Sequence, residues 1–184
     1  GRHNAVDTIA GWMWLHDSPQ TPMRGDDKVF YTTGRLTSEM VIKSAQMGVP
    51  VVVSEQYPEG LGPTAASLRA TAADAPVVTK THFSCVADGC LAGTAVEQRR
   101  QVVVVGTEAH VCVQQTVLDL LAAGRQVFVV DEAVGSRRPR DKELALQRMQ
   151  QNGAEIVSRE KVAFEWLEKA NTPLFRDVLK RFIR

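Results

Sequence analysis

The stretch QVVVVGTEAHVCVQQTVLDLLAAG, residues 101–124, decides the fold. Its four consecutive valines, bounded by polar residues, predict a strand that is buried on both faces. The apolar residues that follow recur at helical spacing, and Gly124 stands where a helix would end in a left-handed turn. Cys112 therefore falls between a central strand and a helix, at the sheet edge where open α/β sheets bind ligands. Backbone N–H groups and the helix dipole at this point favour a thiolate.

The composition is that of an ordinary globular protein. A chain of 184 residues with 44% hydrophobic and 23% charged residues predicts a single domain over residues 1–184. The net charge of +1 gives no electrostatic reason to expect nucleic acid or a membrane surface, so a ribonuclease has little support. No apolar run approaches the length of a membrane span. Three cysteines without paired spacing predict free thiols in a reducing compartment.

Short apolar runs alternate with helical patterns along the rest of the chain. We expect further strands at residues 9–16, 51–54, 76–79, 126–131 and 154–157. We expect helices at residues 28–47, 87–98, 140–152, 159–170 and 173–182, a short helix after Thr64, and loops at 55–63 and 132–140. Strands that alternate with helices and are continuously apolar predict a parallel sheet covered on both faces.

Three of the predicted strands are followed by reactive side chains. Asp17 follows the first strand, Lys80 the third and Cys112 the fourth. The carboxyl ends of parallel strands meet at one edge, so these groups are expected to converge. Together they would support nucleophilic chemistry, in which a thiolate attacks an electrophilic carbon, an ammonium stabilises the thiolate and a carboxylate carries the proton.

Each of these residues also has a purely structural interpretation. Asp17 before Ser-Pro is a good turn residue, and an isolated lysine such as Lys80 is more often solvated than catalytic. An isolated cysteine such as Cys112 is more often a small core residue than a nucleophile. His110, two residues before Cys112, offers an alternative Cys–His pair, although a histidine at such a turn is more often hydrogen-bonded structure.

Four motifs resemble the isochorismatase-like cysteine hydrolases. They are VVVGTEAHVCVQQT at residues 103–116, VVDEAVGSR at 129–137, SEQYPEGLGPT at 54–64 and KTHFS at 80–84. The third motif is similar to a narrower branch, the isochorismatase-domain-containing proteins, and the fourth to that family's lysine motif. The resemblance runs from about Trp12 to the C-terminal helices.

The resemblance implies a three-layer α/β/α, Rossmann-like fold with a central, mainly parallel six-stranded sheet. It places the family's catalytic triad on Asp17, Lys80 and Cys112. It also implies a cis peptide bond between Thr107 and Glu108, which would aim the Glu108 N–H beside the Cys112 N–H to form an oxyanion hole.

The chain departs from the family's patterns at two places. The family's Asp-x-Gln is replaced by DSPQ at residues 17–20, which contains one inserted residue. Relatives that bind zinc do so through an aspartate and two histidines after the second strand, whereas residues 55–63 contain no histidine. We therefore expect no metal and no cofactor.

The sequence thus predicts a metal-independent, amidase-type hydrolase of a small molecule, acting through a covalent Cys112 intermediate. Tyr57, Phe83 and His110 are the expected substrate-pocket residues, with Tyr57 on a loop able to close. Two alternatives stay open: a vinyl-ether hydrolase acting on isochorismate, and a catalytically silent interaction protein. Family habit predicts a homo-oligomer.

Overall fold

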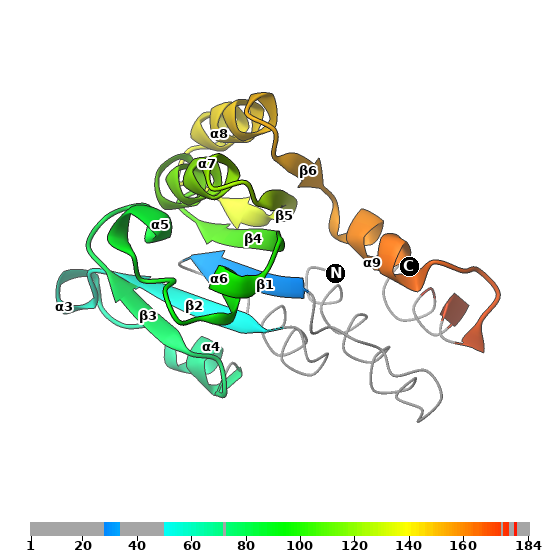
Figure 1. Ribbon diagram of the computed structural model, residues 1–184, viewed down its shortest axis with the longest axis horizontal. Helices are drawn as coiled ribbons and strands as arrows, with labels where there is room; N and C mark the ends of the chain where they lie inside the picture. Colours follow the sequence, from blue (N-terminus) through cyan, green and yellow to red (C-terminus); the bar gives the residue numbers. More distant parts are fainter. Residues whose placement is uncertain (1–27, 34–49, 72, 174, 177–178, 180–184) are drawn as a thin grey trace.

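The computed structural model describes residues 28–33, 50–71, 73–173, 175–176 and 179 (Figure 1). Its strands are β1 (Lys28–Thr33), β2 (Val51–Gln56), β3 (Val77–Lys80), β4 (Gln101–Thr107), β5 (Gln126–Gly135) and β6 (Glu155–Val157). Its helices are α3 (Pro58–Leu61), α4 (Ala66–Thr71), α5 (Cys85–Asp88), α6 (Ala95–Gln98), the π-helical turn η1 (Ala109–Val113), α7 (Gln114–Ala122), α8 (Pro139–Gln151) and α9 (Arg159–Leu167).

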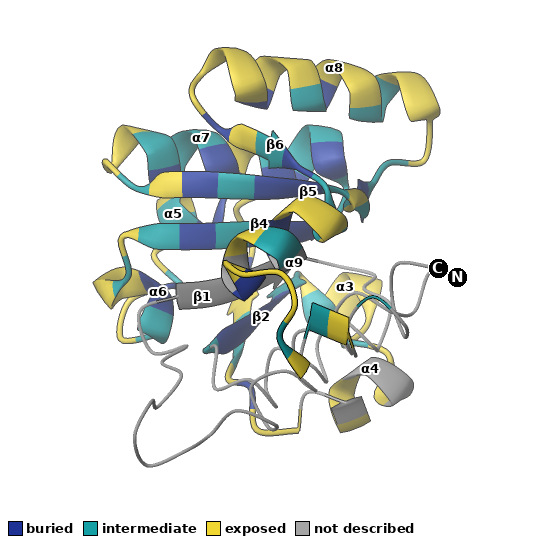
Figure 2. Cartoon of the chain, turned by 90° about the vertical axis from the view of Figure 1, so that its right-hand side faces the viewer, coloured by how far each residue is buried: buried dark blue, intermediate teal, exposed yellow. Residues whose placement is uncertain are grey.

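The strands form one sheet in the order β3-β2-β1-β4-β5-β6, and every neighbouring pair is parallel. Helices α7 and α8 lie on one face and α9 on the other (Figures 1 and 2). Parallel neighbours need crossover connections, and right-handed crossovers that run in opposite directions along the sheet place helices on both faces. The α/β class and the parallel sheet are therefore as the sequence predicts.

The core consists mainly of valines from the central strands. Val102, Val104 and Val105 are fully buried, as expected of a central strand that lies between β1 and β5. The helical stripe after Cys112 supplies buried residues of α7, among them Val117 and Leu120. Gly124 adopts a φ of 77° just after α7, as expected of a glycine that ends a helix. Residues 101–124 thus form the centre of the fold.

The prediction of a helix beginning at residue 28 is wrong. Residues 28–33 form β1, which pairs with both β2 and β4 in the interior of the sheet. The sequence KVFYTT is rich in β-branched and aromatic residues, which fit a pleated strand better than a helix. The predicted first strand at 9–16 and the remainder of that helix, 34–47, lie outside the described residues.

Three other boundaries differ from expectation. Within the predicted loop 55–63, Pro58 begins the short helix α3, since proline fits the first position of a helix. The predicted helix 87–98 is divided into α5 and α6, because Gly89 and Gly93 both take positive φ values. Strand β5 continues to Gly135, into the predicted loop 132–140, where its last residues pair with the end of β4.

The carboxyl edge of the sheet carries the residues that matter for function. Lys80 and Gln56 are register partners at the ends of β3 and β2. A register irregularity between Val104 and Gly106 precedes the end of β4, from which the chain enters η1. Irregularities of this kind are common next to active sites, where they redirect the chain. No helix within the described residues is long and apolar enough to span a membrane.

Candidate active site

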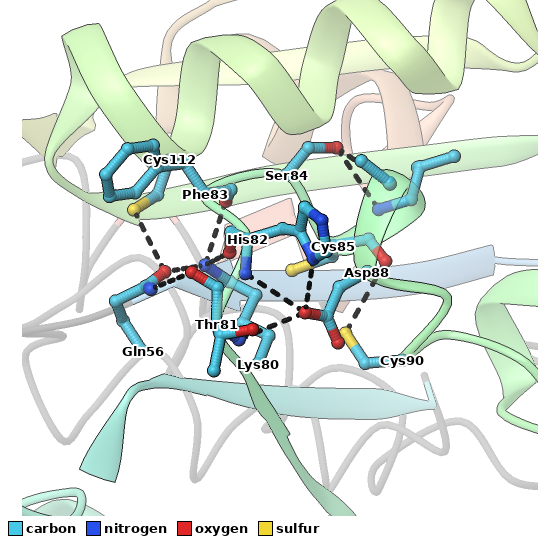
Figure 3. A network of polar contacts seen from close by, with 12 residues as sticks. Gln56, Lys80, Thr81, His82, Phe83, Ser84, Cys85, Asp88, Cys90 and Cys112 are labelled. Atoms are coloured by element: carbon cyan, nitrogen blue, oxygen red, sulfur yellow. Dashed lines mark hydrogen bonds and ion pairs between the residues drawn. The ribbon is translucent and has the colours of Figure 1, made fainter. Parts of the chain in front are cut away.

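Lys80 ends β3 with a side chain that is only 3% exposed. Its Nζ donates hydrogen bonds to the Gln56 Oε1, to the His82 carbonyl at 3.1 Å and to the Phe83 carbonyl at 2.8 Å (Figure 3). An ammonium has three hydrogens, so all three are used. Charge-assisted bonds of this kind compensate for removing the ammonium from water.

The loop after Lys80 is shaped so that its carbonyls face the ammonium. The Asp88 carboxylate accepts from the backbone N–H of Thr81 and of His82, each at 3.0 Å, and contacts the His82 imidazole at 3.0 Å. The His82 hydrogen bonds, backbone first, hold the pKa of Asp88 below its ordinary value. Asp88 thus anchors the start of the loop, and the carbonyls of the next two residues, His82 and Phe83, face Lys80.

Ser84 connects this loop to the helix that follows Cys112. Its buried hydroxyl caps α5 by accepting from the N–H groups of Val86 and Ala87, and it donates to the Asp119 carboxylate on α7 at 2.5 Å. One residue later, the Cys85 N–H donates to the Thr116 hydroxyl, also on α7, at 3.1 Å. The Lys80 loop and the Cys112 helix are therefore held in fixed relation.

Cys112 lies in η1, between β4 and α7, and is 9% exposed. The peptide bond between Thr107 and Glu108 is cis. The Glu108 carbonyl accepts from the N–H groups of Val111 at 3.1 Å and Val113 at 3.2 Å. These two bonds fix the turn and do not involve the N–H of Cys112 between them.

The charge state of Cys112 differs from the expectation of a favoured thiolate. Burial raises the pKa of the thiol above its ordinary value, and the Lys80 ammonium lowers it only in part. Because a thiolate loses more hydration than a thiol when it is buried, desolvation outweighs the effect of the lysine. In the substrate-free protein the sulfur is therefore protonated at neutral pH.

This raised pKa predicts the pH dependence of Cys112 alkylation. Iodoacetamide reacts with thiolates, so the rate at Cys112 should rise with pH around a midpoint above that of the same cysteine in the urea-unfolded chain. Peptide-level mass spectrometry separates Cys112 from Cys85 and Cys90. A midpoint below that of the unfolded chain would support the expectation of a favoured thiolate and would contradict a pKa raised by burial.

Gln56 is the site residue that sequence reasoning missed. Its Oε1 accepts from Lys80 and, at 3.7 Å, from the Cys112 Sγ, so these two predicted residues meet at one amide oxygen (Figure 3). Its Nε2 donates to the Thr81 carbonyl at 2.7 Å. The available signal was a polar residue close to the end of a buried strand, but Gln56 lies two residues beyond the predicted end of that strand at residue 54.

The predicted pocket residues lie on elements around this edge. Tyr57 and Phe83 are each 50% exposed. The Tyr57 N–H donates to the Lys80 carbonyl at 2.8 Å, and the Phe83 carbonyl binds the Lys80 ammonium, so both flank the lysine. The His110 imidazole hydrogen-bonds to the Ser136 hydroxyl at 2.9 Å. This contact agrees with the structural interpretation of the histidine.

The third member of the predicted triad, Asp17, lies outside the described residues. All three cysteines are within them and remain thiols. Across the described ranges, no group of three or more His, Cys, Asp or Glu residues could hold a metal ion. The arrangement that can be described is therefore a buried thiol and a buried ammonium, joined through a glutamine.

Comparison with known proteins identifies the family. The family model "Isochorismatase domain" matches residues 21–161. The chain is 41% identical over 133 residues to isochorismatase domain-containing protein 1 of Danio rerio, covering 72% of this chain and 47% of that protein. It thus spans about half the length of that relative.

Two further relatives cover more of their own length. A secreted isochorismatase effector of Phytophthora sojae is 38% identical over 149 residues, covering 78% of this chain and 71% of that protein. The structure of MAR1 ribonuclease from Caenorhabditis elegans superposes with a TM-score of 0.74 at 29% identity, covering 88% of this chain and 92% of that one. The chain belongs to the isochorismatase family.

Proposed function

We propose that the chain is a cysteine-dependent hydrolase that cleaves the C–N bond of a small amide through a covalent intermediate on Cys112. The observation that carries the proposal is the meeting of Cys112 and Lys80 at the Gln56 amide oxygen, on the carboxyl edge of the sheet. A nucleophilic side chain beside a buried ammonium is typical of covalent catalysis.

In the first half of the reaction, the Cys112 sulfur attacks the carbonyl carbon of the amide. The C–N bond breaks, the thiol proton passes to the leaving nitrogen, and an acyl thioester remains. We assign this proton transfer to Asp17, by the family resemblance, and the support of developing negative charge on sulfur to Lys80. Since burial favours the protonated thiol, the proton has to leave the sulfur before or during the attack.

In the second half, water attacks the thioester, releasing the carboxylic acid and returning the thiol. In both halves the carbonyl oxygen becomes an oxyanion, which the N–H groups of Glu108 and Cys112 would hold. The bonds from Val111 and Val113 to the Glu108 carbonyl support this assignment, because they fix the turn while leaving the Cys112 N–H out of them. The scheme needs no cofactor.

Trapping the acyl-enzyme tests this proposal. A panel of small neutral amides is incubated with the protein, quenched in acid and analysed by intact and peptide mass spectrometry. We expect the mass of the acyl group on the peptide containing Cys112, and its disappearance when product forms. An amide that is hydrolysed without any adduct on that peptide, even under rapid quench, contradicts the covalent route.

The same panel, with isochorismate added to it, separates the other candidate functions. Turnover of isochorismate but of no amide would favour the vinyl-ether hydrolase. Turnover of neither, together with a Cys112 that does not react with iodoacetamide, would favour the catalytically silent interaction protein. The name of the Caenorhabditis elegans relative makes RNA a further substrate to include. The balanced charge of the chain does not favour a polyanion. That the chain forms a homo-oligomer remains a prediction, which light scattering can test.

A further inference from the structure

The side-chain amide of Gln56 has one defined orientation. Its Nε2 faces the Thr81 carbonyl, which can only accept, and its Oε1 faces the Lys80 ammonium, which can only donate. A flipped amide would oppose donor to donor at Lys80 and acceptor to acceptor at Thr81. The hydrogen-bond network itself therefore assigns the oxygen to the side of Lys80 and Cys112.

This orientation determines what Cys112 can do in the resting protein. The Sγ lies 3.7 Å from an oxygen that offers only lone pairs, so the sulfur can interact with this oxygen only as a donor. A thiolate at the same place would oppose two electron-rich atoms. Among the described elements, the charged or titratable groups that act on Cys112 are Lys80 from β3, Cys85 from α5 and Glu108 from the turn after β4.

We propose that Gln56 is a positioning residue that keeps Cys112 as a thiol by accepting its hydrogen bond, and that occupies one N–H of the Lys80 ammonium at the same oxygen. The inference rests on the proposed function and extends it to the resting state. Because thiolates are the form that oxidants and electrophiles attack, a protonated sulfur is protected while the site is empty. Gln56 touches both chemical groups but exchanges no proton or bond itself.

Two substitutions test this role by moving one observable in opposite directions. Gln56→Met removes the acceptor, so the thiol loses its hydrogen bond and one N–H of Lys80 becomes free to stabilise negative charge on the sulfur. Gln56→Glu places a carboxylate there, which pairs with Lys80 and repels a thiolate. Both variants lose the donation to Thr81, so the effect of that bond is common to both and cancels in their comparison.

The readout is the pH profile of iodoacetamide alkylation at Cys112, quantified on its peptide. We expect Gln56→Met to lower the midpoint and speed alkylation at pH 7 by about three- to tenfold, and Gln56→Glu to slow it by a similar factor. Gln101 provides matched controls, since its amide bonds to Gln126 at the amino end of β4. Gln101→Met and Gln101→Glu should leave the profile unchanged.

A merely structural role for Gln56 would move both variants in the same direction, and no role would move neither; either result overturns the inference. The measurement needs no substrate, so it is independent of the amide panel. Opposite shifts in a protein that hydrolyses nothing would sustain the resting-state role and remove the hydrolase. An acyl adduct with unshifted profiles would do the reverse.

Discussion

Replacing Cys112 by serine is expected to reduce kcat/KM for any amide substrate by roughly a thousandfold or more. The hydroxyl of serine is a far weaker acid than a thiol, and the described surroundings offer Lys80 and Gln56 but no base in contact with residue 112. The fold should survive, because serine can donate to the same Gln56 oxygen. The free energy of unfolding should change by less than about 1 kcal/mol.

Urea denaturation and steady-state kinetics on the same preparations check both halves of this prediction. Cys90→Ser is the matched control, since Cys90 is a partly buried thiol whose sulfur contacts the Cys85 carbonyl at 3.5 Å and not Gln56. That variant should keep wild-type turnover. If turnover were retained in Cys112→Ser and lost in Cys90→Ser, the nucleophile would be Cys90 and the assignment of Cys112 would be wrong.

The sequence places Lys80 and Cys112 correctly because buried valine runs locate strand ends. Once the strands are known to be parallel, their carboxyl ends share an edge, and side chains that are distant in sequence meet there. The family motifs around residues 80 and 112 add to this inference. No sequence pattern, however, indicates that the two groups meet through a third residue.

The role of Gln56 was not predictable because it depends on the direction in which the side chain points, which the sequence does not encode. A glutamine ending a strand usually faces solvent, and only the register of β2 with β3 brings it beside Lys80. The prediction of a favoured thiolate at Cys112 was wrong for a related reason. Local features, the helix start and the nearby lysine, favour a thiolate, whereas burial is a property of the packed structure and acts against it.

Strand β1 shows the opposite limit, where local pattern gave the wrong element. Residues 28–33 precede an apolar pattern of helical period, and the prediction extended that helix over them. Pairing on both sides with β2 and β4 makes the segment a strand. The composition of KVFYTT agrees with a strand, but its place between β2 and β4 depends on non-local pairing that a window of the sequence does not contain.

Replacing Lys80 by methionine should have the second largest effect, acting on stability and on activity together. Three oxygens, the carbonyls of His82 and Phe83 and the Gln56 Oε1, would lose their shared donor. Unsatisfied buried acceptors cost about 1–3 kcal/mol each, offset in part because the ammonium no longer has to be desolvated. We expect a net loss of roughly 2 kcal/mol in the free energy of unfolding.

The activity of Lys80→Met should fall by roughly a hundredfold or more, because the cation that supports negative charge on sulfur is gone. The pKa of Cys112 should rise further, since Lys80 is the group that lowers it, and the alkylation midpoint should move to higher pH. Lys142→Met is the control: Lys142 also donates to a backbone carbonyl, that of Asp131, at 2.8 Å, but lies on α8. Stability lost without any change in kcat/KM or in the midpoint would make Lys80 a structural lysine and remove the ammonium from the mechanism.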